Sequence, residues 1–170
     1  HQTLFPTVKV SKAEGWPIDK APTPAPGFAV HAFARNLEHP RWLYTLPNGD
    51  VLVAETDAPP KPDDGKGIKG FFMKMIMKHV GSDKGSPNRI TLLRDTNADG
   101  AADQAIPFIT GLNSPFGMAL VGNDLYVADT DALLKFPYHE GDTAITARPV
   151  KVADLPAGTI NHHWTKNVIA

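Results

Sequence analysis

The sequence contains no cysteine. Disulfide bonds, thiolate metal centres and a cysteine nucleophile are therefore excluded. The chain also lacks an excess of either charge, with 17 basic and 18 acidic side chains, so no broad field favours nucleic acid as a partner. No apolar run approaches the roughly 20 residues that span a bilayer. Residues 1–4 show no feature of a signal peptide, so if the protein is exported we expect its signal to have been removed or left out of this sequence.

Several catalytic motifs are absent as well. The chain has no G-x-G-x-x-G after a predicted strand, no G-x-x-x-x-G-K, no G-x-S-x-G and no H-E-x-x-H. Nicotinamide, nucleotide and common hydrolase chemistries thus lose their usual support. What the chain has in quantity is turn formers, with 14 glycines and 16 prolines. This composition favours many short strands joined by turns, and hence an all-β fold.

One stretch of the sequence occurs twice. Residues 37–56 read LEHPRWLYTLPNGDVLVAET, and residues 112–130 read LNSPFGMALVGNDLYVADT. The two copies share their first leucine, the prolines Pro40 and Pro115, and the endings V-A-E-T and V-A-D-T. A repeated strand–turn–strand unit that follows a proline is typical of a modular β-architecture.

Alternating apolar runs predict the individual strands. In the first copy, Pro47-Asn48-Gly49 separates two such runs, and Asn-Gly predicts a hairpin turn because both positions accept positive φ. The expected strands are residues 28–34, 42–46, 50–55, 89–94, 105–110, 117–121, 124–128, 132–137, 150–154 and 167–170.

The repeat also predicts the organisation of the chain. Residues 1–27 are rich in proline and form an extended arm. Residues 28–170 form part of a β-propeller, with one blade at 28–111 that includes an insert at 57–88, a second blade at 112–160, and the start of a third at 161–170. Without the insert, each unit has about 45 residues, the size of a four-stranded blade. Because propellers close with four to eight blades, we expect an N-terminal fragment of a larger domain. The alternative is a complete two-sheet β-sandwich.

The insert contains a basic and apolar segment. Residues 67–80 read GIKGFFMKMIMKHV, with Lys69, Lys74 and Lys78 among Phe, Ile and Met. This pattern predicts a short amphipathic helix. In the simpler interpretation, its apolar face packs on the rim of the domain. The alternatives are a lid over a site, or contact with a membrane surface or a protein partner.

Residues 161–167 gather the most chemistry-bearing side chains. The segment reads NHHWTKN and directly precedes the first strand of the third unit, where the loops of a propeller face its central channel. A histidine is a natural general base at neutral pH, so His162 and His163 are candidates for catalysis. The alternative is a pair of rim histidines with no catalytic role.

A second polar segment resembles a calcium-binding loop. Residues 95–103 read DTNADGAAD, and the D-x-N-x-D-G pattern matches the first half of an EF-hand loop. The twelfth position is Ile106 in place of the bidentate glutamate. We therefore predict a metal-free hairpin turn first. Weak Ca²⁺ binding is the alternative, and its candidate ligands are Asp95, Asn97, Asp99 and Asp103.

Together these segments resemble the glucose/sorbosone dehydrogenase family, and within it the L-sorbosone dehydrogenase branch. The segments that carry the resemblance are LEHPRWLYTLPNGDVLVAET, LLRDTNADGAAD, GLNSPFGMALVGNDLYVADTDALLKFPY and INHHWTKN. The resemblance implies a six-bladed β-propeller that binds pyrroloquinoline quinone (PQQ) and Ca²⁺. It also implies a periplasmic or secreted enzyme that oxidises a sugar or a sugar-derived aldehyde, with hydride passing to the quinone and the substrate proton to a histidine.

The resemblance also implies roles for particular residues. In the family's Asp-His-x-x-Gly-Arg segment, the histidine falls on His163, the preceding acid is replaced by His162, and Gly-Arg is replaced by Lys166-Asn167. Lys166 supplies a cation for a quinone carboxylate or an oxyanion, as a point charge. Asn113, at the mouth of the preceding blade, is a further pocket residue. The family's main calcium site is expected outside these 170 residues, and the rest of the propeller is needed for activity.

Two other functions are compatible with the same sequence. One is a propeller without catalytic activity that binds a protein or a glycan, with residues 67–80 as the contact. The other is a propeller lactonase in which a metal ion activates water. Oxidation assays with and without PQQ and Ca²⁺ distinguish the dehydrogenase from both.

Overall fold

The computed structural model of the chain describes residues 17, 20–59, 85–158, 161 and 163–170. The chain divides into two compact units. One unit comprises Thr23–Pro62 and Gly85–Ala170 and contains all the described strands. The other comprises His1–Pro22 and Asp63–Lys84. Only a few of its residues are described, among which the Lys20 backbone N–H donates to the Pro17 carbonyl at 3.1 Å.

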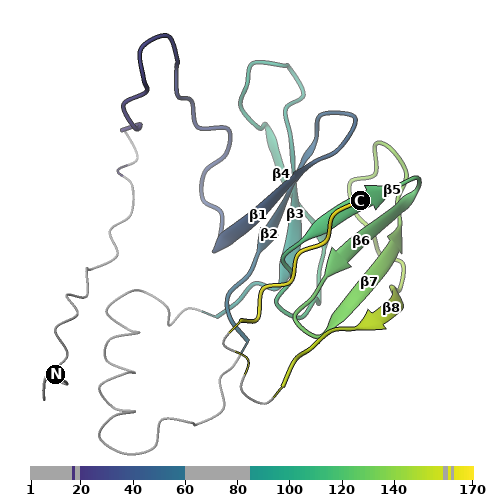
Figure 1. Cartoon of the computed structure of the whole chain (residues 1–170). Helices are drawn as coiled ribbons and strands as arrows, with labels where there is room; N and C mark the ends of the chain where they lie inside the picture. The colour runs from purple at the N-terminus through teal and green to yellow at the C-terminus, as the bar shows by residue number, and fades with distance from the viewer. Residues whose placement is uncertain (1–16, 18–19, 60–84, 159–160, 162) are drawn as a thin grey trace, which may run out of the picture. The chain divides into compact units, whose positions relative to one another are not determined.

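The larger unit consists of two antiparallel four-stranded sheets (Figure 1), each with its strands in sequence order. The first sheet contains β1 (Pro40–Thr45), β2 (Val51–Glu55), β3 (Arg89–Arg94) and β4 (Gln104–Ile109), and the second contains β5 (Met118–Val121), β6 (Asp124–Ala128), β7 (Ala132–Pro137) and β8 (Val150–Asp154). The all-β prediction is confirmed, and these eight strands match the predicted ones to within one or two residues at each end.

The first hairpin forms where Asn-Gly predicted it, but through a different turn. Gly49 has a φ of 90°, whereas Asn48 does not have positive φ. The Gly49 N–H donates to the Leu46 carbonyl at 2.9 Å, and the Leu46 N–H donates to the Asp50 carbonyl at 2.8 Å. This is a three-residue loop in which proline occupies the second position of the turn and glycine takes the left-handed conformation. The expectation of positive φ at both positions was wrong.

Two predicted strands do not form. Residues 28–34 and 167–170 are irregular, although both are rich in apolar residues. Phe28 is 76% exposed; its N–H donates to the Ala25 carbonyl at 3.1 Å, and the Phe33 carbonyl accepts the Ala102 N–H at 2.8 Å. An apolar run alone makes no strand, because a strand also needs a neighbouring edge with which to pair.

The core lies between the two sheets. On the first sheet, Leu52 pairs with Leu92 and Ala54 with Ile90, so one face of β2 and β3 is apolar. The cluster comprises Leu46, Leu52, Ala54, Ile90, Leu92, Phe108, Ile109 and Leu112 from the first sheet and its flanks, and Met118, Leu125, Val127, Phe136, Tyr138 and Ile145 from the second. The Tyr44 hydroxyl also accepts a hydrogen bond from the Leu120 N–H at 3.0 Å, which joins β1 to β5.

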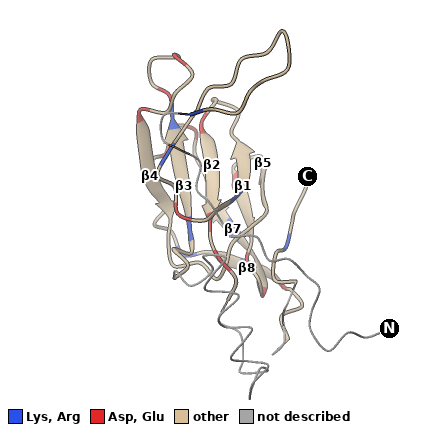
Figure 2. Cartoon of the chain, turned by 90° about the vertical axis from the view of Figure 1, so that its left-hand side faces the viewer, with Lys and Arg blue, Asp and Glu red and all other residues tan. Residues whose placement is uncertain are grey.

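Charged residues fasten the two sheets at the end where the β1–β2 turn lies. The charged residues of β3 stand at its two ends (Figure 2). One of them, Arg94, binds Asp50 through Nε at 2.8 Å and Nη2 at 2.6 Å. Its Nη2 also lies 3.4 Å from the Gly141 carbonyl, in the loop between β7 and β8. The hydrogen bond from Arg94, with a further one from Asn48, holds the pKa of Asp50 below its usual range despite partial burial.

The predicted helix at residues 67–80 and most of the predicted arm at 1–27 lie outside the described residues. The described part of the chain contains no helix, and consequently none there that is long and apolar enough to cross a membrane.

Candidate functional site

The loops that lead into each repeat unit meet at the opposite end of the sheets. We call this region the loop end and define it as residues 36–41, 112–117, 161 and 163–167, with the turns 56–58 and 129–131. The Thr56 N–H donates to the His39 carbonyl and the Thr130 N–H to the Asn113 carbonyl, both at 3.0 Å. The Gly117 N–H donates to the Lys166 carbonyl at 2.9 Å, so the C-terminal segment lies beside the start of β5 (Figure 1).

In each copy of the repeat, a carboxylate at the end of the second strand accepts a backbone N–H from the loop that precedes the first strand. Glu55, at the end of β2, accepts the Glu38 backbone N–H, and Asp129, just after β6, accepts the Asn113 N–H at 2.8 Å. In both loops the residue before the proline has a φ of 50°, His39 in the first copy and Ser114 in the second. The sequence repeat is therefore also a repeat of local structure.

The two carboxylates differ in their surroundings. Glu55 has no exposed surface and binds Arg89 Nε at 2.8 Å as well as the Thr91 hydroxyl. Burial alone raises the pKa of Glu55, but the hydrogen bonds from Arg89, Thr91 and the Glu38 N–H outweigh it and hold that pKa below its usual value. Glu55 is thus an ionised, fully paired group.

Among the described residues, Asp129 has no such cation as a partner. It is 4% exposed, and its Oδ1 has no hydrogen-bond partner among the described residues. Burial raises the pKa of Asp129 to about 7, and the neighbouring charge of Asp131 adds to the effect, against a smaller opposing contribution from the Asn113 N–H. The hydroxyl of Ser114, in the same loop, is also buried without a described partner. Two polar groups at the loop end are therefore buried and incompletely satisfied.

The structure places His163 at the loop end with an exposed side chain. Its backbone carbonyl accepts a hydrogen bond from Lys166 Nζ at 3.0 Å, which folds the half-buried lysine back along its own segment. His162 lies outside the described residues. An exposed imidazole with an ammonium group three residues away is an arrangement suited to proton abstraction near an anion.

Asn167 is held against β5 by a close approach of two backbones. Its Oδ1 accepts the Val168 N–H at 2.9 Å. A Cβ on Gly117 would lie 2.6 Å from both the Asn167 Cα and the Val168 N, closer than atoms approach, so only glycine fits there. Asn113 has an exposed side chain, and its backbone makes the contacts to Asp129 and Thr130. Of the predicted residues, Lys166 and His163 touch directly, and Asn167 lies next to them along the chain.

Aromatic rings that sequence reasoning did not assign to the site join the start of β1 and the loop before β5 to the C-terminal segment. The ring centroids of Trp42 and Phe116 lie 5.2 Å apart, and those of Phe116 and Trp164 lie 6.5 Å apart in an edge-to-face arrangement. Arg41 Cζ lies 5.9 Å from the centroid of the Trp164 ring. The available signal was positional, because Arg41, Trp42 and Phe116 follow the two repeated prolines directly.

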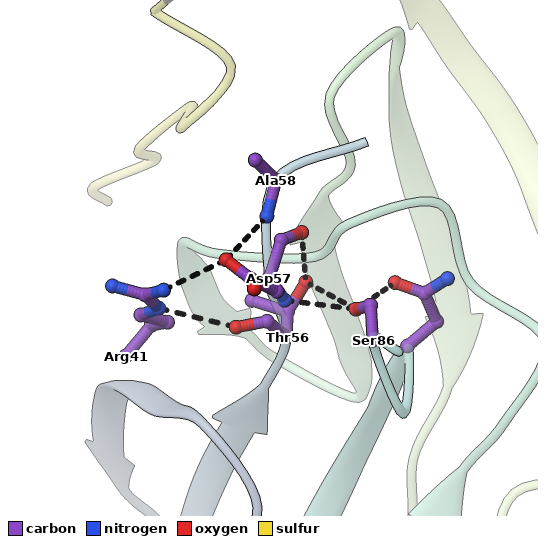
Figure 3. Close-up of polar contacts among 6 residues, drawn as sticks. Arg41, Thr56, Asp57, Ala58 and Ser86 are labelled. Atoms are coloured by element: carbon purple, nitrogen blue, oxygen red, sulfur yellow. Dashed lines mark hydrogen bonds and ion pairs between the residues drawn. The ribbon is translucent and has the colours of Figure 1, made fainter. Parts of the chain in front are cut away.

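Polar contacts extend from Arg41 to the other side of the β2 end. In Figure 3, Arg41 lies on one side of Thr56 and Asp57, and Ser86 lies on the other. Ser86 Oγ accepts the Asp57 N–H at 2.8 Å and donates to Asn88 Oδ1 at 2.6 Å. Asn88 Oδ1 also accepts the Ser114 N–H at 3.2 Å. These contacts connect the first sheet to the loop that leads into the second.

In the loop at residues 95–103, side-chain oxygens accept hydrogen bonds from backbone N–H groups of the same loop. Asp95 accepts the N–H groups of Ala98 at 2.7 Å and Gly100 at 2.9 Å, and Asp103 accepts the Thr96 N–H at 2.7 Å. The described residues contain no group of three or more histidine or acidic side chains that could hold a metal ion. A hairpin turn closed by its own carboxylates accounts for this geometry. Weak calcium binding there stays a prediction.

A pocket of about 380 Å³ borders the loop end at Leu112. It is lined by residues 109–112, Leu134, Phe136 and residues 145–149, from the end of β4, from β7 and from the loop before β8. None of the predicted site residues lines it.

Comparison of the chain with protein-family models, with curated proteins and with solved structures finds no match.

Proposed function

We propose that the two sheets are successive blades of a six-bladed β-propeller, with residues 161–170 beginning a third. Each sheet is a four-stranded meander of consecutive strands, whereas immunoglobulin-like sandwiches connect their sheets by Greek-key crossings. The repeated carboxylate at the end of the second strand, and the repeated positive φ before the proline, support two copies of one unit. The whole propeller is then needed to form a central channel.

We further propose that this propeller is a PQQ-dependent dehydrogenase that oxidises a sugar or a sugar-derived aldehyde. The observation that carries the proposal is the exposed His163 at the end where the loops of all three units meet. The resemblance of the sequence to the glucose/sorbosone dehydrogenase family supplies the reaction class. A periplasmic or secreted location belongs to the same proposal.

The donor set at the loop end fits part of the proposed cofactor. PQQ is a planar quinone with three carboxylates, and Lys166 supplies a cation that is held on the backbone carbonyl of His163, whose imidazole is exposed. When bound, the quinone supplies the acceptor for the hydride that leaves the substrate carbon. The chain's own part is that His163 takes the proton of the substrate hydroxyl, Lys166 offsets negative charge, and Asn113 and Asn167 offer amides for orientation.

The test is His163→Ala in the full-length protein, with turnover measured by dye-linked oxidation in the presence of PQQ and Ca²⁺. Removing the general base should lower turnover by about a hundredfold or more. The matched control is His139→Ala, because His139 is also exposed, at 74% of its side chain, but lies in the loop after β7 and pairs with Asp142. Near-normal turnover of the His163 variant would contradict the assignment. Absence of PQQ-dependent oxidation in the unmodified protein would leave the partner-binding and lactonase alternatives.

A further inference from the structure

Arg41 is held in a fixed orientation at the loop end. It is the second residue of β1, and its Nε donates to the Thr56 carbonyl at 3.1 Å while Nη2 donates to Asp57 Oδ1 at 2.9 Å (Figure 3). The face of its guanidinium lies 5.9 Å from the ring centroid of Trp164, the residue that follows His163. Two hydrogen bonds and a cation–π contact thus fix a long side chain that would otherwise sample many rotamers.

The Arg41 side chain also has N–H donors that make no hydrogen bond with the described residues. A guanidinium carries five N–H donors, and two of them have partners among the described residues. Of the arginines in the described strands, Arg41 has the most exposed side chain, at 41%, compared with 29% for Arg89 and 23% for Arg94. Its partner Asp57 is only 10% exposed. The buried carboxylate of Asp57 therefore holds one side of the Arg41 guanidinium, while another part of the guanidinium is exposed to solvent.

We propose that Arg41 binds a carboxylate of the ligand taken at the loop end, with the planar part of that ligand placed beside Trp164. A pre-oriented guanidinium edge matches a carboxylate with two parallel hydrogen bonds, and little entropy is lost because Arg41 is already ordered. Thr56 and Asp57 take one N–H each of Nε and Nη2, which leaves Nη1 and the second N–H of Nη2 for the ligand. The inference rests on the proposed function in taking the loop end as the ligand-binding end. Lys166, which folds onto the His163 carbonyl, remains the second cation there.

The test compares a charged and an uncharged form of the same ligand. The dissociation constants of PQQ and of its trimethyl ester are measured by fluorescence titration of the full-length protein, the Arg41→Gln variant and the Arg41→Lys variant. Arg41→Gln should weaken PQQ binding tenfold to a hundredfold, the effect of one lost charge-assisted contact, and should weaken ester binding less than threefold. Arg41→Lys should fall between, because it keeps the charge without the fork. It also serves if the glutamine variant does not fold.

The matched control is Arg94→Gln, which removes an arginine–aspartate pair on the same sheet at the opposite end. It should leave the ratio of the two affinities unchanged. Equal weakening of PQQ and ester in Arg41→Gln, no weakening of either, or the same change of ratio in Arg94→Gln would each overturn the inference, because a structural role for Arg41 gives those results.

A separate probe distinguishes failure of the inference from failure of the proposed function. If the unmodified protein binds neither PQQ nor its ester, the proposed function fails, and naphthalene-2-carboxylate is compared with naphthalene-2-carboxamide in its place. A preference for the carboxylate that Arg41→Gln abolishes would support the inference on its own. Absence of any such preference in the unmodified protein would overturn it.

Discussion

Glu55 and Asp129 occupy the same place in the two copies of the repeat, but only Glu55 has an arginine and a threonine hydroxyl as partners among the described residues. Arg89 pairs with Glu55 across the β2–β3 ladder, whereas the matching position beside Asp129 is Ala132, whose carbonyl accepts the Asp129 N–H. The carboxylate with the cation has a lowered pKa, and the one without it has a pKa raised to about 7. The cation of Arg89 and the hydroxyl of Thr91 beside Glu55 thus reverse the effect that burial alone has on ionisation.

Asp129→Asn should make the protein more stable at pH 8. The pKa of Asp129 rises from 3.8 when unfolded to about 7 when folded, so the folded state binds more protons and stability falls as pH rises through this interval. Asparagine keeps an acceptor for the Asn113 N–H without the buried charge. We expect a gain of about 2–4 kcal/mol in the free energy of unfolding at pH 8, vanishing near pH 4, measured by urea denaturation.

Glu55→Gln is the matched variant and should behave in the opposite way. The folded-state pKa of Glu55 is lowered from 4.5, so its contribution is present above that pH and is lost as pH falls through the folded-state value. The variant should lose about 2–4 kcal/mol at pH 7, because Arg89 loses its buried partner. Parallel pH profiles for the two variants would contradict the opposite ionisation of these residues.

For these residues, the sequence predicted that Glu55 and Asp129 correspond to one another, but not which side chains surround each of them. The endings V-A-E-T and V-A-D-T align by inspection. That Arg89 faces Glu55 depends on the register of two strands separated by the 57–88 insert. Arg41 was missed for a related reason, since its partners Asp57 and Trp164 lie 16 and 123 residues along the chain.

The β-strands were easier to predict from the sequence than the contacts of single side chains. Eight strands follow from apolar runs bounded by Gly, Pro, Asn and Asp, because those residues end a ladder for local steric reasons. The two failures, residues 28–34 and 167–170, are rich in apolar residues but have no strand pairing in the described structure. Strand pairing depends on whether a neighbouring segment offers a free edge, and a local sequence pattern does not specify that.

Gly117→Ala should detach the C-terminal segment from β5. A Cβ there would meet backbone atoms of Asn167 and Val168 at 2.6 Å, and backbone cannot move aside as a side chain can. We expect a loss of about 1–3 kcal/mol and faster hydrogen exchange at Gly117, whose N–H donates to the Lys166 carbonyl. Gly158→Ala is the control, since nothing lies within 4 Å of its added Cβ. Equal exchange at residue 117 in the parent chain and in the Gly117→Ala variant would contradict the expected detachment of the C-terminal segment from β5.

For the larger unit as a whole, the two sheets are joined from one end to the other. Apolar side chains of both sheets form one core, Arg94 links the turn end to the Gly141 carbonyl, and Asn88 links the loop end to Ser114. The composition predicted the all-β class, and the repeat predicted two sheets. The row of rings at Trp42, Phe116 and Trp164 could not be predicted, because it exists only once three loops converge.

Ligand binding at the loop end can be measured by hydrogen–deuterium exchange of the full-length protein with PQQ and Ca²⁺. We expect slower exchange in peptides covering residues 112–118 and 161–168, with no change in peptides covering residues 47–51 and 139–143 at the turn end. Slower exchange confined to the turn end, or no change in any of these peptides at saturating ligand, would contradict ligand binding at the loop end.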